Sequence, residues 1–139
     1  MKKALVVEAH DGIRQLLIEV LTQQGYSVNS ISNGLQALVK IRECIPSVVL
    51  LDSIMPGMGG IEVLTKISNS YPDLPVILIA HTDEQDVKAS LESGLVKYCI
   101  FKPFSLTDLI ELLNSLDIRH SAYASRCKIT SSAESNISL

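Results

Sequence analysis

Two charged side chains in this sequence directly follow apolar runs, and their types suit phosphoryl chemistry. Asp52 follows Val48–Leu51 and precedes a glycine-rich turn. A carboxylate there can act as a nucleophile toward phosphorus, because aspartyl phosphates are an established kind of covalent intermediate. Lys102 ends another apolar run and precedes Pro103, a position where a cis X-Pro bond would help to aim the lysine inward. An ammonium group beside a transferring phosphoryl group stabilises the charge that develops there.

Glu8 is a third candidate, and it follows the first apolar run of the chain. An acid here, close to Asp52, would make a hard oxygen site of the kind that Mg²⁺ occupies, with one or two carboxylates, waters and a phosphate. Glu8 would serve equally well as a structural partner of Lys102. The sequence leaves both roles open.

The elements that must position these side chains follow from the apolar pattern, which switches between short β-rich runs and longer stretches of helical period. We therefore predict strands alternating with helices around a parallel sheet. The first helix is expected to be capped by Asp11 and to end at Gly25, and the last to be capped by Ser105. The expected strands are residues 4–7, 26–31, 48–51, 76–79 and 98–101.

The topology of such a sheet predicts where the charged residues meet. The runs 48–51 and 76–79 show no polar alternation, so these strands are expected at the centre. In open parallel sheets the reactive crevice lies beyond the carboxyl ends of the central strands. The periodic pattern stops near residue 116, so we predict one domain over 1–116 and a flexible, serine-rich tail or linker over 117–139.

Composition argues against several other classes of protein. The 139 residues carry 12 Lys and Arg against 15 Asp and Glu, a net charge of −3 with no basic block, so direct binding to nucleic acid is not expected. The apolar runs are far shorter than the roughly 18 residues of a membrane-spanning helix, and we predict no membrane segment or signal peptide. Three scattered cysteines indicate neither a disulfide framework nor a metal site, and favour a reducing cytoplasm.

Two segments are specific enough to indicate a family. Residues 48–64, with the motif Met55-Pro-Gly-Met-Gly-Gly60, resemble the phosphorylation segment of response-regulator receiver domains nearly residue for residue. Phe101-Lys-Pro-Phe104 resembles the lysine–proline motif of the same family. The resemblance runs from Lys2 to about Leu116. It implies an α/β, flavodoxin-like three-layer fold whose five parallel strands have the order 2-1-3-4-5.

The resemblance also implies roles for particular residues. Asp52 would be the phospho-acceptor, Lys102 would contact the phosphate, and Mg²⁺ would bind Glu8, Asp52 and the backbone carbonyl of Ile54. The family usually has two adjacent acids at the end of the first strand, but Ala9 stands at the second of these positions. Mg²⁺ binding is therefore expected to be weakened, unless Glu8 or Asp11 compensates.

The switch positions of the family also differ in this chain. The Thr or Ser that usually ends the fourth strand is Ala80 here, which has no hydroxyl group to bond a phosphoryl oxygen. The aromatic switch residue is Tyr98 when counted from Gly94, but the position is Cys99 when counted from Lys102. We take Ala80 and Tyr98 as the switch pair, with Cys99 as the alternative.

Four further side chains have chemistry that the motif does not use. His10 and His81 are predicted at the active edge, where either could be a ligand or a proton carrier, although a single histidine in a loop is more often polar surface. Cys44 and Cys99 are predicted to be buried and to pack as small apolar residues.

Two functions from different classes are compatible with these residues. The first is a receiver domain in a two-component phosphorelay, which takes a phosphoryl group from a histidine kinase or phosphotransfer protein onto Asp52. It would then change its contacts with a downstream protein, and by resemblance those contacts involve the last two strand–helix units. The second is a pseudo-receiver that binds proteins without phosphorylation, and Ala9 and Ala80 motivate it.

An enzyme is not expected. Nucleotide or flavin sites on such folds use a glycine-rich phosphate loop after the first strand, and residues 8–12 read Glu-Ala-His-Asp-Gly. No large apolar surface patch is recognisable in the sequence, so we expect a monomer or a weak dimer.

Overall fold

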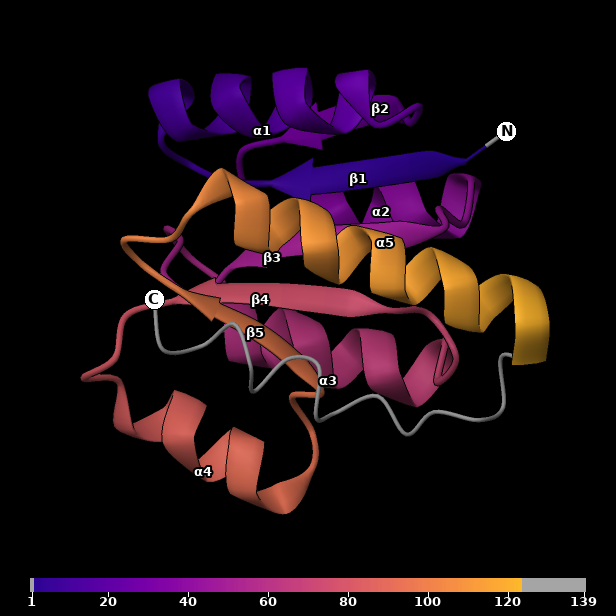
Figure 1. The fold of residues 1–139 in the computed structure, drawn as a ribbon. Coiled ribbons are helices and arrows are strands. Elements are labelled where there is room, and N and C mark those ends of the chain that lie inside the picture. Colours follow the sequence, from indigo (N-terminus) through magenta and orange to yellow (C-terminus); the bar gives the residue numbers. More distant parts are fainter. Residues whose placement is uncertain (1, 124–139) are drawn as a thin grey trace.

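The computed structural model describes residues 2–123, with side chains described as far as Leu116. Strands and helices alternate along the chain, as the apolar pattern predicts (Figure 1). The strands are β1 (Lys3–Val7), β2 (Ser27–Ile31), β3 (Val48–Asp52), β4 (Val76–Ala80) and β5 (Tyr98–Phe101). The helices are α1 (Asp11–Gln23), α2 (Gly34–Glu43), α3 (Gly60–Ser70), α4 (Gln85–Ser93) and α5 (Leu106–Tyr123).

The five strands form one parallel sheet in the order β2-β1-β3-β4-β5, which confirms the predicted fold class and strand order. Helices cover both faces of this sheet (Figure 1). One core cluster joins the sheet to α1 and α5 through residues such as Leu17 and Leu113. The other joins it to α2, α3 and α4 through residues such as Ile41, Val63 and Val87. The protein is thus a three-layer sandwich.

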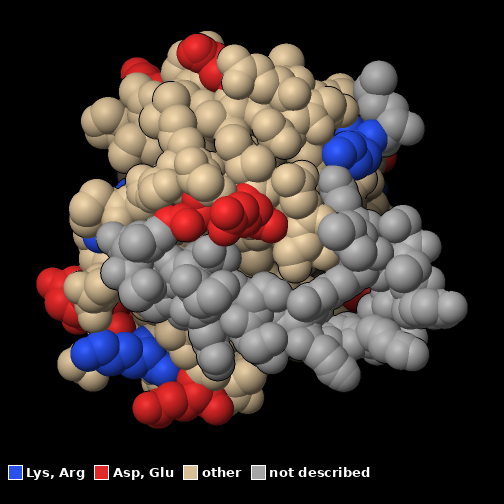
Figure 2. Space-filling model, in the orientation of Figure 1, with Lys and Arg blue, Asp and Glu red and all other residues tan. Residues whose placement is uncertain are grey.

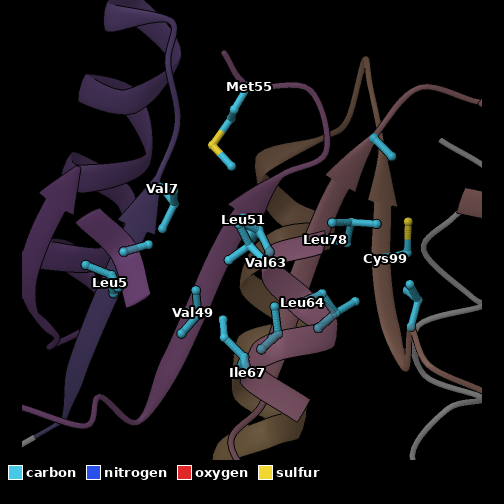
Figure 3. Packing of buried hydrophobic residues seen from close by; sticks show 14 of the residues in the cluster. Leu5, Val7, Val49, Leu51, Met55, Val63, Leu64, Ile67, Leu78 and Cys99 are labelled. Atoms are coloured by element: carbon cyan, nitrogen blue, oxygen red, sulfur yellow. The ribbon is translucent and has the colours of Figure 1, made fainter. Parts of the chain in front are cut away.

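The central position of β3 and β4 follows from their composition. Every residue of both strands is buried, because consecutive side chains point to opposite faces and each face carries a helix layer. On β3, Leu50 packs with the α1/α5 layer, whereas Leu51 packs with the α2–α4 layer. Figure 3 shows the second of these cores, in which Leu51 and Leu78 lie beside Val63 and Leu64. Strand β2 lies at the edge of the sheet, and three of its five residues are polar and exposed.

Helix ends differ from the prediction at two places. The N-cap of α1 is His10 rather than Asp11, because the His10 Nδ1 atom accepts a hydrogen bond of 3.2 Å from the Ile13 amide. At the other end of the domain, α5 continues to Tyr123, past the predicted boundary at 116. The rest of the predicted tail, residues 124–139, lies outside the described residues.

A glycine follows two of the helices, and the one after α1 agrees with the prediction. Gly25 follows α1 with a φ of 91° and Gly94 follows α4 with a φ of 87°, a left-handed conformation that glycine adopts without strain. Within the described part of the chain, no helix is long and apolar enough to span a membrane.

Candidate functional site

The carboxyl edge of the sheet brings Glu8, Asp52 and Lys102 together. The Lys102 Nζ atom lies 3.5 Å from Asp52 Oδ1 and 3.9 Å from Glu8 Oε1. Glu8 is 1% exposed and Asp52 4% exposed. Two acids and one lysine therefore share a small volume that excludes most water, where their mutual interactions are stronger than at an open surface.

Strand pairing explains why these three residues meet. Val7 of β1 pairs with Leu51 of β3, so the next residues, Glu8 and Asp52, reach the same level at the edge. The Glu8 amide extends the ladder with a hydrogen bond of 3.1 Å to the Ile31 carbonyl.

Lys102 reaches the same edge from the other side of β3. Ala80 pairs with Phe101, and the Lys102 amide donates a hydrogen bond of 2.8 Å to the Ala80 carbonyl. The Lys102–Pro103 peptide bond is cis.

Asp52 is held by the loop that follows it. Its Oδ1 atom accepts a hydrogen bond of 3.2 Å from the Ile54 amide. The loop closes where the Gly60 amide donates a hydrogen bond of 2.9 Å to the Ser53 carbonyl, at the first turn of α3. A Cβ atom on Gly60 would lie 2.4 Å from the Asp52 carbonyl oxygen and 2.6 Å from the Ser53 Cα. Glycine at position 60 is thus what allows α3 to begin directly against the end of β3.

The environment of Glu8 disfavours its charged form. Burial is the largest cause, and the neighbouring Asp52 adds to it, so that the pKa of Glu8 rises from 4.5 to about 7. The His10 amide, which donates a hydrogen bond of 3.1 Å to Glu8 Oε2, and the positive charge of Lys102 lower that pKa but do not offset the rise. Near neutral pH, Glu8 is therefore partly protonated. Lys102 lies nearer to the Asp52 carboxylate than to that of Glu8.

The donor set fits a hard divalent cation that uses few protein ligands. Glu8 Oε1 is buried and has no hydrogen-bond partner among the described residues, so it is an oxygen that a cation would satisfy. Asp52 supplies a second carboxylate oxygen beside it. No group of three or more His, Cys, Asp or Glu side chains within the described residues could hold a metal ion. Water and a phosphoryl group would have to complete the coordination of Mg²⁺.

Asp11 does not replace the acid that Ala9 lacks. Its side chain is 91% exposed and forms an ion pair with Arg14. Arg14 also donates a hydrogen bond of 2.9 Å from Nη1 to the Glu8 carbonyl oxygen, so it fixes the loop after β1 and holds Asp11 at its outer side. Sequence reasoning missed Arg14, because only the folded loop shows the carbonyl group that it binds.

The predicted switch pair of Ala80 and Tyr98 is divided by the sheet. Ala80 packs in the α2–α4 core, whereas Tyr98 packs in the α1/α5 core. Because side chains alternate along a strand, the residue of β5 that shares a face with Ala80 is Cys99, together with Phe101. This corrects the choice of Tyr98 and favours the count from Lys102. Both positions on the shared face, 80 and 99, carry small apolar side chains.

The cysteines and histidines also have definite environments. Cys99 is fully buried (Figure 3), and burial with a smaller contribution from Glu84 raises the pKa of its thiol to about 12. Cys44 is exposed, contrary to expectation, because it lies at the end of α2, with Lys3 Nζ 3.3 Å from its sulfur. The His10 imidazole caps α1, and His81 is exposed in the loop after β4. Cys127 lies outside the described residues.

Ser53 and Glu84 form a contact that sequence reasoning also missed. The Ser53 hydroxyl donates a hydrogen bond of 2.7 Å to Glu84 Oε2, across 31 residues of sequence. Ser53 lies in the phosphorylation segment but Glu84 belongs to no recognisable motif, so no signal in the sequence pairs them.

Comparisons with known proteins agree with this geometry. The chain matches the response regulator receiver domain family over residues 4–114. The DNA-binding response regulator MtrA of Mycobacterium tuberculosis is 37% identical over 110 residues, which cover 78% of this chain and 47% of that protein. Sporulation initiation phosphotransferase F of Bacillus subtilis is 37% identical over 109 residues, which cover 78% of this chain and 87% of that protein. The chain thus spans about half the length of MtrA.

Solved structures show the same fold. Response regulator TrrA of Thermotoga maritima, in complex with Mg²⁺ and BeF, has a TM-score of 0.74 at 34% identity and covers 84% of this chain and 99% of its own. The Francisella response regulator 1452 receiver domain has a TM-score of 0.78 at 26% identity and covers 86% and 99%. Given the family match, the strand order and these relatives, the chain belongs to the response-regulator receiver domains of two-component phosphorelay signalling.

Proposed function

We propose that this domain accepts a phosphoryl group on Asp52 from a histidine kinase or phosphotransfer protein. The observation that carries the proposal is the buried contact of 3.5 Å between Lys102 Nζ and Asp52 Oδ1 at the carboxyl edge of the sheet. An acceptor carboxylate with a fixed cation beside it is the arrangement that phosphoryl transfer requires. The domain acts in signalling, and its contacts with a downstream protein would change with the phosphorylation state of Asp52.

Asp52 and Lys102 have different roles in the proposed transfer. Lys102 and the Ile54 amide both contact Asp52 Oδ1, so we assign the attack on phosphorus to Oδ2. The new P–O bond forms as the bond between phosphorus and the donor breaks. Lys102 then compensates the negative charge of the aspartyl phosphate. The Lys102 amide is hydrogen-bonded to the Ala80 carbonyl, and the peptide bond that follows Lys102 is cis.

Glu8, Asp52 and the backbone carbonyl of Ile54 are the groups that we assign to Mg²⁺. The bound ion would neutralise charge on the phosphoryl oxygens. TrrA, whose structure contains Mg²⁺ and BeF, supports this assignment. Ala9 offers no oxygen from its side chain, so we expect weaker binding than in a receiver domain with two adjacent acids. A partly protonated Glu8 must also lose its proton before it can act as a ligand.

Acetyl phosphate with Mg²⁺, followed by intact-protein mass spectrometry, tests the proposal. We expect a mass increase of one phosphoryl group in the unmodified chain and none in Asp52→Asn. Asp83→Asn is the matched control, since Asp83 is an exposed acid in the loop after β4 at the same edge. It should be labelled like the unmodified chain. Equal labelling of Asp52→Asn would overturn the assignment of the acceptor.

A pseudo-receiver that binds proteins without phosphorylation is the second candidate. Two observations favour it: Ala9 in place of an acid, and the fully buried Ala80 in place of a hydroxyl residue. Complete absence of labelling in the unmodified chain, with both acetyl phosphate and a kinase, would select this function.

The partner surface is proposed to involve α4, β5 and α5. Helix α4 buries only Val87 and Ser90, so most of its side chains face outward. Figure 2 shows the face that carries α5, where the coloured Lys and Arg side chains form small separate groups rather than a continuous basic surface.

A further inference from the structure

Glu84 is the N-cap residue of α4, yet its side chain does not cap its own helix. Its Oε2 atom instead accepts two hydrogen bonds from preceding parts of the chain. One comes from the Ser53 hydroxyl at 2.7 Å and the other from the His81 amide at 2.8 Å. Glu84 thereby ties the loop after β3 and the loop after β4 to the start of α4.

Both residues that donate hydrogen bonds to Glu84 directly follow a residue of the acceptor site or of the switch. Ser53 directly follows the acceptor Asp52 and is 7% exposed, and His81 directly follows Ala80. The His81 amide thus links Glu84 to the residue after position 80, which lacks the hydroxyl group of the family switch.

We propose that the hydrogen bond between Ser53 and Glu84 couples the acceptor loop to α4, in place of the missing hydroxyl switch. The coupling rests on the proposed function, because it is the phosphoryl group on Asp52 that would change it. Glu84 is a positioning residue in this account and does not contact the reacting atoms.

Electrostatics gives the coupling its direction. Phosphorylation replaces the single negative charge of the Asp52 carboxylate with the charge of a phosphoryl group, about −2, so it adds about one negative charge next to Ser53. Within residues 2–116, no ion pair holds the Glu84 carboxylate, which depends on the Ser53 hydroxyl and the His81 amide. The part of this charge that Lys102 and Mg²⁺ leave uncompensated repels the Glu84 carboxylate and weakens its hydrogen bond to Ser53.

The effect should be large on α4 because this helix has few other anchors. Val87 is its one fully buried apolar side chain, Leu91 is partly buried, and the Ser90 hydroxyl bonds within the helix to the Asp86 carbonyl. Release of the Glu84 carboxylate would therefore loosen the first turn of α4 on the surface proposed to meet the partner.

Hydrogen exchange measured by NMR tests the coupling without phosphorylation. Ser53→Ala and Glu84→Ala should each speed exchange of the α4 amides by about tenfold, because a hydrogen bond to a charged group is lost. The double variant should show no more than Glu84→Ala alone, because that variant already removes the Ser53 bond together with the His81 bond. Glu92→Ala is the control, because Glu92 is an exposed acid of the same helix. Additive effects, or α4 exchange like the control, would overturn the inference.

Beryllofluoride with Mg²⁺, a mimic of the phosphoryl group, tests the response. We expect amide shifts at Ile54, at Lys102 and along α4 in the unmodified chain. Glu84→Gln keeps the shape of the side chain but loses its charge, so the α4 shifts should fall to less than about half while those of Ile54 and Lys102 persist.

The two proposals fail in different ways. Shifts at Ile54 and Lys102 with an unchanged α4 response in Glu84→Gln would overturn the coupling alone. No shifts at Ile54 and Lys102 in the unmodified chain would overturn the proposed function, and the hydrogen-exchange cycle would then decide by itself whether Ser53 and Glu84 couple the two loops.

Discussion

The proposed acceptor region and the switch region lie close together in the sheet, but the first is made of charged side chains and the second of small apolar ones. Around Asp52, Glu8 and Lys102 form a buried cluster of charges. On the next two strands, β4 and β5, Ala80 and Cys99 give the switch region small apolar side chains. Compared with the family pattern, this chain keeps the acid and the lysine that we propose for the acceptor site, whereas it has neither a hydroxyl residue at position 80 nor an aromatic residue at position 99.

Burial makes the acceptor region sensitive to pH, and Glu8→Gln should show the largest effect. The pKa of Glu8 is about 7 in the fold against 4.5 ordinarily, so the native state holds its proton more tightly than the unfolded chain. The stabilisation is complete below pH 4.5 and is lost as pH rises through 7. A shift of this size corresponds to about 3 kcal/mol.

Urea unfolding at pH 5 and pH 8 without Mg²⁺ measures this loss. Glutamine does not titrate, so Glu8→Gln should be more stable than the unmodified chain by up to about 3 kcal/mol at pH 8, and by much less at pH 5. Glu92→Gln, an exposed site, should show no such dependence. Equal differences at both pH values would mean that Glu8 is not an acid of raised pKa.

Gly60→Ala probes the close packing of the acceptor region. The new Cβ atom would overlap the Asp52 carbonyl and the Ser53 Cα, so we expect a loss of about 1–3 kcal/mol in the free energy of unfolding. Gly59→Ala is the neighbouring control, because a Cβ atom there would lie 3.8 Å from the Ser53 carbonyl oxygen, an ordinary contact. Its cost should stay below about 1 kcal/mol. Equal costs would refute the close approach of α3.

Ala9→Asp should restore an acidic ligand to the acceptor region. We expect Mg²⁺ to bind about tenfold more tightly, a gain of ~1.4 kcal/mol. Isothermal titration calorimetry measures the dissociation constant, and Ala9→Asn is the control that adds a similar volume without charge. An unchanged constant in Ala9→Asp would mean that Glu8 already supplies the needed oxygen or that the site is closed to a further ligand.

Ala80→Ser should bring part of the missing hydroxyl chemistry to the switch region. One added hydrogen bond to the phosphoryl mimic is worth about 1 kcal/mol, so beryllofluoride affinity should rise about fivefold. Fluorine NMR of the bound mimic measures it. Ala80→Cys is the control, since its thiol has a similar size but is a weak donor. No gain in Ala80→Ser would show that position 80 does not face the phosphoryl site.

The sequence was sufficient for the fold and for the residues that meet at the edge. The buried runs of β3 and β4 predict a two-sided sheet, and a residue that directly follows a strand has a fixed place at its end. Glu8, Asp52 and Lys102 were located in this way.

Other features depend on contacts that a linear pattern does not record. The choice between Tyr98 and Cys99 required the strand register, which decides the face on which each side chain lies. His10 rather than Asp11 caps α1, while the Asp11 carboxylate pairs with Arg14, and the sequence alone shows neither contact. The pairing of Ser53 with Glu84 joins two loops that are distant in sequence.

The central claim is that Asp52 and Lys102 form a working phosphoryl site, and a titration with beryllofluoride at millimolar Mg²⁺ tests it most directly. We expect the NMR amide signals of Ser53, Ile54 and Lys102 to shift only when both Mg²⁺ and beryllofluoride are present. The same signals should stay in place in Asp52→Asn. Signals that do not move in the unmodified chain would contradict the claim and leave a domain that binds its partners without phosphorylation.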